Sequence, residues 1–433
     1  MMKRIIFGKG GFMDFLNSLV GSINDFLWTY IIIVVLVGSG LWFTLSTGLV
    51  QLRALPEMVR LLAGDLGRRP SGRKAISSFQ AFCVSTASRV GVGNIAGVAI
   101  AIVTGGPGAV FWMWVIAFIG TATGFVESTL AQIYKISRGH GLFHGGPAYY
   151  IQNALGQPAV AKLFAVLISV TFGLIYVSVQ ANTIALSMEK AFGIDTWVMG
   201  AVLAILSGAV IFGGIQRVAN FSTLLVPVMA GIYLLIAAII IVLHIDQVPA
   251  MFALILHDAF SPQAAVGGGI GTAILTGIRR GLFSNEAGEG SIPNAAATAN
   301  VTHPVKQGLV QAFGVYVDTW IVCSATAFIV LLTGQYTIGG DTTGIALAQD
   351  SLASAFGPWA SSLLAVLIFL FAFSSVVGNY YYGEINIHFF GGNTKRALLI
   401  YRLGVVAMVF FGCVAALGLV WNLADLFMAM ICL

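Results

Sequence analysis

Residues 85–106 read "STASRVGVGNIAGVAIAIVTGG", an apolar stretch that is interrupted by Gly91, Gly93 and Asn94. Each glycine destabilises a helix by about 1 kcal/mol relative to alanine, so we expect the helix to unwind here. Unwinding exposes carbonyl groups that can coordinate a cation, and the half-helix that follows presents N–H groups to a carboxylate. On this stretch alone, close packing of helices through small residues explains the glycines equally well.

A second apolar segment is broken five spans later, in residues 277–300, which read "GIRRGLFSNEAGEGSIPNAAATAN". The interruption contains Ser284, Asn285, Glu286, Gly288, Gly290 and Pro293. Discontinuous helices at matching positions of two halves are typical of secondary transporters with inverted repeats and a binding site at the bilayer midplane. Five helices in each repeat would invert the second repeat, because five is odd. The pair of breaks therefore favours a transporter.

The overall composition is that of a membrane protein, because 58% of the residues are hydrophobic, 9% are charged and the mean hydropathy is +0.94. We predict spans at residues 27–51, 79–103, 108–134, 161–189, 196–214, 221–244, 266–299, 306–333, 356–382 and 397–419. An eleventh begins near Leu423 and reaches Leu433. It is too short for a bilayer core of about 30 Å at about 1.5 Å per residue, so we expect this helix to be incomplete.

These spans predict an all-α polytopic protein in three parts. Residues 1–78 form an N-terminal segment with an extra first helix and a basic cytoplasmic loop. Residues 79–262 form the first five-helix repeat, and residues 263–433 form the second, inverted one.

Lys and Arg residues in the connections orient the bundle, since cytoplasmic loops retain positive charge. One side holds Arg53, Arg60, Arg68, Arg69, Arg73, Lys74, Lys135, Arg138, Lys162, Arg217, Lys306, Lys395, Arg396 and Arg402. The opposite connections hold Lys190, and Lys3, Arg4 and Lys9 precede the first span. We therefore predict an N-terminus outside the cell. The asymmetry accounts for the net charge of +5 without a nucleic-acid partner.

Several charged residues fall at membrane depth, where a charge costs at least a few kcal/mol unless it is paired or faces water. They are Arg89, Glu127, Glu286 and Asp318, and near the span boundaries Arg279, Arg280, Glu289 and Glu384. Together they indicate a polar interior. A structural ion pair explains each of them about as well as contact with a ligand does, and Arg89 has Glu127 and Asp318 as possible partners.

Blocks of sequence between Gly91 and Thr326 resemble the sodium-coupled alanine or glycine symporter family of prokaryotes. They are "VGNIAGVAIAIVTGGPGAVFWMW", "VESTLAQ", "HGGPAYYI", "VQANTIA", "RRGLFSNEAGEGS" and "YVDTWIVCSATA", and the weaker "FLFAFSSVVGNYYYGE" extends the match to Glu384. The resemblance implies an inner-membrane protein with eleven helices and a leucine-transporter-like core of two five-helix inverted repeats. It also implies uptake of a small amino acid driven by sodium, with no organic cofactor.

The same resemblance implies which residues form the sites. The substrate would contact Gly91, Gly93, Asn94, Gln180, Ser284, Asn285 and Gly288. Sodium would be held by the hydroxyls of Ser374 and Ser375 and the carbonyls near Ala87 and Val90, with Asn94 as a further ligand, because sodium prefers hard oxygen donors. Two positions depart from the expected pattern: Val92 stands where threonine is common, and Asn379 where an aromatic residue is common.

The small residues at this site suit a zwitterion with a side chain no larger than methyl or hydroxymethyl, so alanine, glycine or serine is the expected cargo. A proton-coupled transporter of the same fold is the alternative, with Glu127, Glu286 or Asp318 as the titrating group. An enzyme is not expected, because the six histidines show no metal-ligand spacing and no nucleophile motif is present. The four cysteines, Cys83, Cys323, Cys413 and Cys432, are interpreted as reduced packing residues. The sequence leaves the oligomeric state open.

Overall fold

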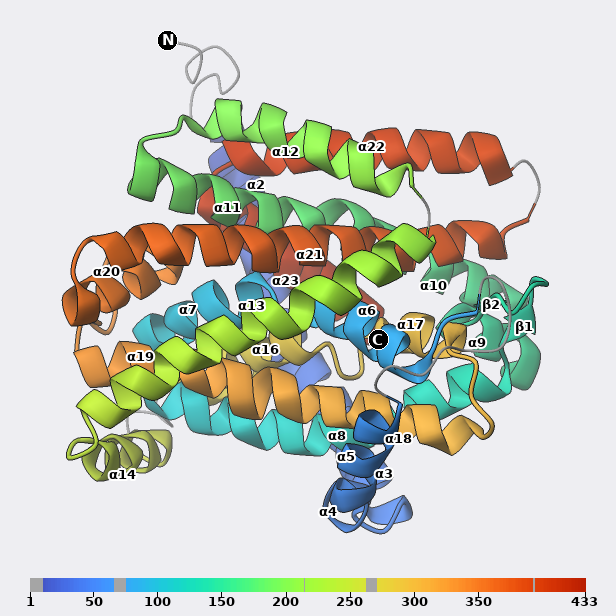
Figure 1. Ribbon diagram of the computed structural model, residues 1–433, viewed down its shortest axis with the longest axis horizontal. Coiled ribbons are helices and arrows are strands. Elements are labelled where there is room, and N and C mark those ends of the chain that lie inside the picture. Colours follow the sequence, from blue (N-terminus) through green and yellow to red (C-terminus); the bar gives the residue numbers. More distant parts are fainter. Residues whose placement is uncertain (1–10, 66–74, 214, 262–270, 392–393) are drawn as a thin grey trace.

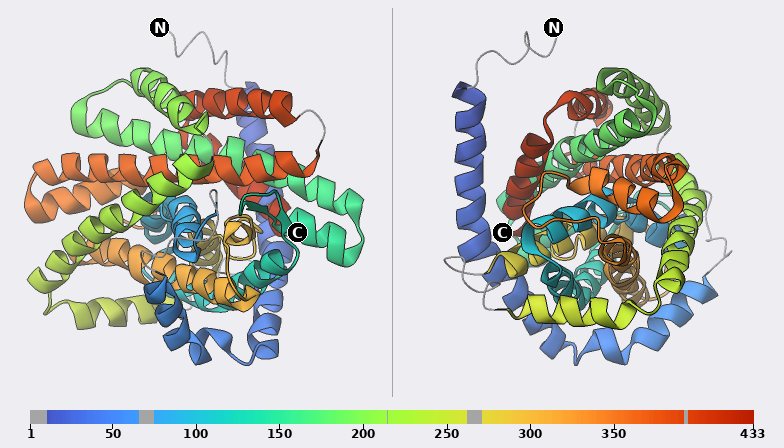
Figure 2. Two further views of the ribbon diagram at one scale, coloured as in Figure 1. Left: turned by 45° about the vertical axis from the view of Figure 1, so that its right-hand side comes forward. Right: turned by 90° about the vertical axis from the view of Figure 1, so that its left-hand side faces the viewer.

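The computed structural model describes residues 11–65, 75–213, 215–261, 271–391 and 394–433, and these are mostly helical. The chain begins with one continuous helical rod made of α2 (Gly11–Leu27), the π-helical segment η1 (Trp28–Ile32) and α3 (Ile33–Ser46). This rod stands at one side of the bundle (Figure 2, right). Two short helices follow it, α4 (Val50–Arg53) and α5 (Leu55–Gly64).

The predicted start of the first span at residue 27 is wrong, since the helix already runs from Gly11. Hydropathy alone misplaced it because polar side chains in this part of the rod contact protein. Asn24 donates a hydrogen bond to the Asn422 carbonyl (2.9 Å), and the Trp28 indole donates to the Asp425 carbonyl (3.1 Å). Both acceptors lie on the last helix of the chain.

Five membrane segments follow. The first is a broken pair, α6 (Ser78–Arg89) and the continuous run of η2 (Gly93–Gly97) and α7 (Val98–Gly105), which are bent by 50°. The others are α8 (Gly108–Ile133), the continuous run α10 (Pro158–Val170), η3 (Thr171–Tyr176) and α11 (Val177–Phe192), then α12 (Thr196–Ile211) and α13 (Ile215–Leu243). A capping box between Ser77 and Gln80 fixes the start of α6.

Five further segments repeat this order, again starting with a break. They are the pair α16 (Thr272–Asn285) and α17 (Ile292–Thr298), the run α18 (Pro304–Val315), η4 (Tyr316–Cys323) and α19 (Ser324–Thr333), and then α21 (Trp359–Phe389), α22 (Thr394–Val414) and α23 (Leu417–Cys432). The two sets interlock: α8 packs on α16 and α18, and α11 packs on α21 and α22 (Figure 1). The predicted inverted-repeat fold with an extra N-terminal helix is confirmed.

Span lengths within the described ranges agree with that fold. Seven helices are long and apolar enough to cross a membrane, and the bent pair of α6 and α7 makes an eighth. The shorter α12 and α23 and the broken pair of α16 and α17 complete the predicted set. The last boundary was wrong: the chain turns at Ala416, so α23 begins at Leu417 and not near Leu423. The predicted division between repeats, after residue 262, lies outside the described residues.

Short elements cover the two ends of the bundle (Figure 1). At one end lie α14 (Val248–Ala259) and α20 (Gly344–Phe356), which the span prediction did not include. At the other end lie α9 (Pro147–Leu155) and a two-stranded antiparallel hairpin, β1 (Ile136–Ser137) and β2 (Phe143–His144). The hairpin end carries the predicted cytoplasmic charge of the loop from 135 to 162, and the orientation in the membrane stays a prediction from that charge.

Candidate functional site

The two helix breaks lie against each other in the centre of the bundle. In the second break, Glu286 has a left-handed backbone (φ 55°), and Gly288 and Gly290 have φ of 92° and 70°. A Cβ atom on Gly93 of the first break would lie 3.1 Å from the Ser284 Cα atom of the second. A side chain at position 93 would therefore crowd the backbone of the second break. The segments predicted to face each other do so.

Asp318 on η4 joins the two breaks through its carboxylate. Asn94 of the first break donates to Asp318 Oδ1 (2.7 Å), and Ser284 of the second donates to Asp318 Oδ2 (2.8 Å). Thr319 donates to the same Oδ2 (2.9 Å). All four side chains are fully or almost fully buried, so these hydrogen bonds form away from water. Because hydrogen bonds to a charged group are stronger than neutral ones, Asp318 orients both Asn94 and Ser284.

The remaining predicted substrate residues surround the same breaks. Gln180 Oε1 accepts from the Val92 amide (3.1 Å), and Asn94 Oδ1 accepts from the Gly91 amide (2.9 Å). Asn285 donates to Thr319 Oγ1 (3.3 Å), and its own oxygen accepts from the Ala287 amide (3.0 Å). The structure thus brings Gly91, Gly93, Asn94, Gln180, Ser284 and Asn285 into one polar cluster. Gly288 lies in the connection between α16 and α17, where its positive φ allows the chain to turn.

The predicted sodium ligands lie at the first break, opposite α21. Ser375 donates to the Ala87 carbonyl (2.9 Å), and Ser374 lies 3.4 Å from the same oxygen. Both hydroxyls also bond to the Phe371 carbonyl one turn earlier, as serines in membrane helices often do. Val90 follows as the non-helical residue that ends α6. Hydroxyl and carbonyl oxygens at this point fit a small hard cation such as sodium.

Gly91 separates the predicted sodium and substrate groups. A Cβ atom at this position would collide with Ser375 Oγ and lie 2.9 Å from Gln180 Oε1. The backbone of the first break therefore fits between α21 and α11 only because residue 91 has no side chain. This contact explains the glycine better than general helix packing does.

The predicted ion pair of Arg89 with Glu127 or Asp318 is not formed within 4.0 Å in the described part of the chain. Arg89 instead donates to Gln311, through its carbonyl (3.4 Å) and its Oε1 (3.2 Å). The guanidinium is held on α18, and a Cβ atom on Gly314 would clash with it. This partner could not be predicted from the sequence, because glutamine is neutral and only charged residues were expected to pair with Arg89.

Glu286 is satisfied by hydroxyl groups from both sides. Ser88 donates to Glu286 Oε1 (2.7 Å), and Ser291 donates to Glu286 Oε2 (2.6 Å). Ser88 Oγ also lies 2.5 Å from Asn379 Oδ1 on α21. Asn379, which the sequence marked as a departure from the expected aromatic residue, thus enters the polar cluster. The departure makes this wall of the site polar.

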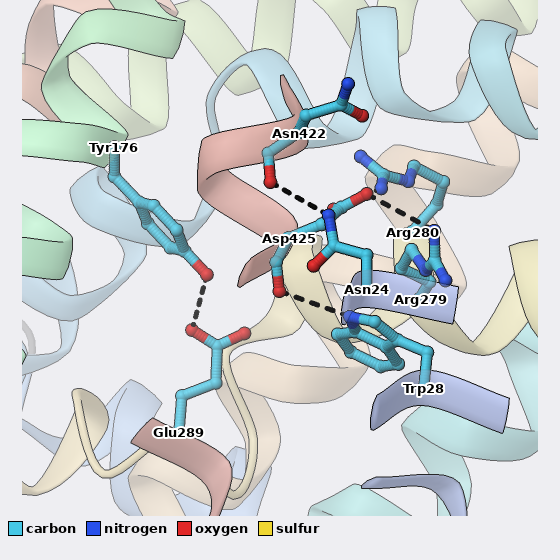
Figure 3. Close-up of polar contacts among 8 residues, drawn as sticks. All are labelled: Asn24, Trp28, Tyr176, Arg279, Arg280, Glu289, Asn422 and Asp425. Atoms are coloured by element: carbon cyan, nitrogen blue, oxygen red, sulfur yellow. Dashed lines mark hydrogen bonds and ion pairs between the residues drawn. The ribbon is translucent and has the colours of Figure 1, made fainter. Parts of the chain in front are cut away.

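A charged and aromatic cluster lies on one side of the site, between α16, α23 and the N-terminal rod (Figure 3). Asp425 on α23 forms an ion pair with Arg280 and lies 3.5 Å from Arg279. Arg280 stands 4.7 Å over the Trp421 ring, and Trp421 in turn packs 4.8 Å from Phe283. Phe283 immediately precedes Ser284. The cluster closes this side of the site and ties α16 to α23.

The prediction from sequence did not assign some residues of the site. Asp318 was expected as a buried charge, a partner of Arg89 or a titrating group, and not as the group that joins the two breaks. Cys323 was interpreted as a packing residue, yet its sulfur lies 3.1 Å from Ser284 Oγ and 3.4 Å from Asn94 Nδ2. Thr326 donates to the Asn94 carbonyl (2.7 Å). All three lie in the block "YVDTWIVCSATA", so the polar residues of that block were the available signal.

Near the hairpin end of α21, a cavity of about 220 Å³ is lined by Arg138, Leu142, His144, Tyr381, Glu384, Ile385 and His388. The rings of His144 and His388 are 5.0 Å apart. Burial and the neighbouring charges of His388 and Arg138 lower the pKa of His144 to about 4. His144 is therefore neutral at physiological pH. No group of three metal-ligating side chains occurs in the part of the chain that the structure describes.

Comparison with known proteins agrees with the fold and with the class of protein. The sequence model described as "Sodium:alanine symporter family" matches residues 13–433. The chain is 52% identical over 420 residues to the amino-acid carrier protein AlsT of Bacillus subtilis (strain 168), covering 97% of this chain and 88% of AlsT. It is 51% identical over 415 residues to the probable sodium/glutamine symporter GlnT of the same organism, covering 96% of this chain and 86% of GlnT. Among solved structures, MhsT in complex with L-phenylalanine superimposes with a TM-score of 0.61 at 16% identity, over 83% of this chain and 88% of that one.

Proposed function

The chain belongs to the sodium:alanine symporter family, and from this premise we propose that it imports a small neutral amino acid together with sodium by alternating access. It is a multi-pass membrane transporter and not an enzyme. The observation that carries the proposal is the carboxylate of Asp318, which connects Asn94 in the first break to Ser284 in the second. A ligand bound between the breaks would therefore affect the hydrogen bonds of both halves of the molecule.

Roles follow from the chemistry of each group. The carboxylate of the amino acid would lie at the N-terminal end of the half-helix that begins at Gly93, where N–H groups and the helix dipole favour an anion. Its ammonium group would contact carbonyls freed by the second break, near Ser284. Sodium would bind at the Ala87 and Val90 carbonyls with the hydroxyls of Ser374 and Ser375. Asn94 would transmit the state of the first break to Asp318.

Alanine, glycine and serine are the proposed cargo, because glycines form the walls of both breaks. Glutamine is the competitor, since a relative at 51% identity is described as a probable sodium/glutamine symporter. The proposed location is the prokaryotic plasma membrane, with the N-terminus outside.

Uptake of radiolabelled alanine into proteoliposomes tests the proposal. We expect accumulation with an inward sodium gradient and none when choline replaces sodium, and excess glycine, serine or glutamine should rank the cargo by competition. A pH gradient imposed without sodium tests the proton-coupled alternative. Uptake that follows the pH gradient and ignores sodium would refute sodium coupling. Protein-free liposomes and the Cys413→Ala variant serve as controls, because Cys413 lies on α22, where its thiol donates to the Ala181 carbonyl of α11 and not to a residue of either break.

A further inference from the structure

Glu289 is a buried carboxylate in the second break with one unused acceptor. Its side chain is fully buried, and Oε2 accepts a hydrogen bond from the Tyr176 hydroxyl (3.1 Å; Figure 3). Oε1 has no hydrogen-bond partner among the described residues. The neighbouring Glu286, by contrast, has both oxygens satisfied by Ser88 and Ser291. Burying an acceptor without a donor costs free energy, so a missing donor is implied at Glu289.

Tyr176 connects Glu289 to the proposed substrate site. Tyr176 and Gln180 are four residues apart on a helix, which puts them on the same face about 6 Å apart along the axis. Gln180 contacts the Val92 amide at the first break. Tyr176 packs 4.8 Å from Phe283, which directly precedes Ser284 at the second break. One face of this helix therefore contacts both breaks, and the Tyr176 hydroxyl on that face holds Glu289 beside them.

The ammonium and carboxylate of the substrate are assigned to the breaks themselves, so the side chain is the part of the substrate that is left to reach a residue beside them. The group that would meet Glu289 Oε1 is therefore the end of the substrate side chain. A hydroxyl or carboxamide would donate a hydrogen bond to it, and a methyl group would leave the carboxylate unsatisfied. Sites that hydrogen-bond a substrate group reject analogues that lack it far more strongly than apolar pockets reject a missing methylene.

We propose that Glu289, oriented by Tyr176, determines specificity by accepting a hydrogen bond from the substrate side chain, so that the carrier prefers amino acids with a side-chain donor to alkyl analogues of equal size. This inference rests on the proposed transport function and names its substrate class. Because a hydrogen bond to a charged group is involved, the preference should be about tenfold or more.

Two matched pairs of competitors test the preference against alanine uptake. Serine is compared with 2-aminobutyrate, in which methyl replaces hydroxyl, and glutamine with 2-amino-5-methylhexanoate, in which the carboxamide becomes isopropyl. The pair with the larger ratio distinguishes a hydroxyl from a carboxamide substrate. The wild type should favour the donor-bearing member of at least one pair by about tenfold.

The variants separate specificity from general transport. Glu289→Leu keeps the approximate volume of the side chain and removes the acceptor, so both ratios should fall to about one, and uptake of serine or glutamine should fall by a larger factor than uptake of alanine. Tyr176→Phe removes only the orienting hydroxyl and should lower the ratio part of the way. It also carries the test if Glu289→Leu does not accumulate. Glu57→Gln, on the exposed helix α5, is the matched control and should leave the ratios unchanged.

Equal competition by both members of each pair in the wild type would overturn the proposal. The proposal would also be overturned if the ratio is unchanged in Glu289→Leu. If that variant protein does not accumulate in the membrane, an unchanged ratio in Tyr176→Phe has the same meaning. A loss of alanine uptake equal to the loss of serine uptake would also overturn it, since Glu289 would then act in general transport. If wild-type uptake does not depend on sodium, the proposed sodium-coupled function is refuted, and this result is distinct from a failure of the specificity proposal. The preference between the members of each pair is then measured from ligand-induced thermal shifts of the purified protein.

Discussion

Asp318→Asn is the change that tests most directly how the two breaks are coupled. Asparagine keeps the shape of the side chain and removes its charge. Oδ1 of the wild-type carboxylate accepts from Asn94, and Oδ2 accepts from Ser284 and Thr319. In the variant, the amide oxygen can still face Asn94, and the two hydroxyls can rotate to accept from the new NH₂ group. The contacts survive, but each becomes a neutral hydrogen bond.

The size of the effect follows from that loss of charge. A hydrogen bond to a charged group contributes about 1.5–3 kcal/mol, and a neutral one about 0.5–1.5 kcal/mol, so each of the three contacts weakens by roughly 1 kcal/mol. A total of about 3 kcal/mol corresponds to roughly a hundredfold change in an equilibrium constant. Stability should change little, because removing a buried charge also removes its desolvation cost. The loss is therefore expected in ligand coupling.

The assay is sodium-dependent alanine uptake in proteoliposomes, with sodium varied at fixed alanine. We expect the sodium concentration for half-maximal uptake to rise by one to two orders of magnitude, since Asn94 connects Asp318 to the Gly91 amide at the proposed sodium site. Thermal unfolding in detergent should show a midpoint close to that of wild type. A half-saturation within twofold of wild type, in a variant that folds normally, would refute the reasoning.

Four further changes extend the test. Ser375→Ala removes a hydroxyl at the Ala87 carbonyl and should weaken sodium dependence of uptake, whereas Cys413→Ala should not. Gly91→Ala forces a methyl group against Ser375 and should abolish uptake in protein that still inserts in the membrane, since overpacking costs about 1–3 kcal/mol. Asp425→Asn leaves two arginines without their carboxylate and should lower the thermal unfolding midpoint more than a substitution of either arginine, because breaking a buried pair costs about 3–5 kcal/mol. The pKa of His144 is lowered from 6.5 to about 4, so its contribution to stability is present above pH 6.5 and is lost as the pH falls toward 4. His144→Gln should therefore flatten the pH profile of the thermal unfolding midpoint between these values. An unchanged profile would contradict the assignment.

The sequence predicted the class of protein, the number of membrane segments and the two breaks. Hydropathy and helix propensity are local properties, and each depends on about twenty consecutive residues, so they can be read without a fold. The errors lay where tertiary contacts override hydropathy. Asn24 belongs to the membrane-facing rod because the Asn422 carbonyl accepts its hydrogen bond, and no window of residues near the N-terminus contains that information.

Only the tertiary structure decided which buried polar groups meet. Asn94 and Asp318 are 224 residues apart, and Arg89 and Gln311 are 222 apart. Sequence composition could show that buried charges must be satisfied, but it could not name the partner, because the partner depends on how helices from two repeats cross. The family resemblance suggested the residues of the breaks themselves. The groups that connect the breaks, Asp318 between them and Tyr176 with Glu289 beside them, became visible only when the helices were packed together.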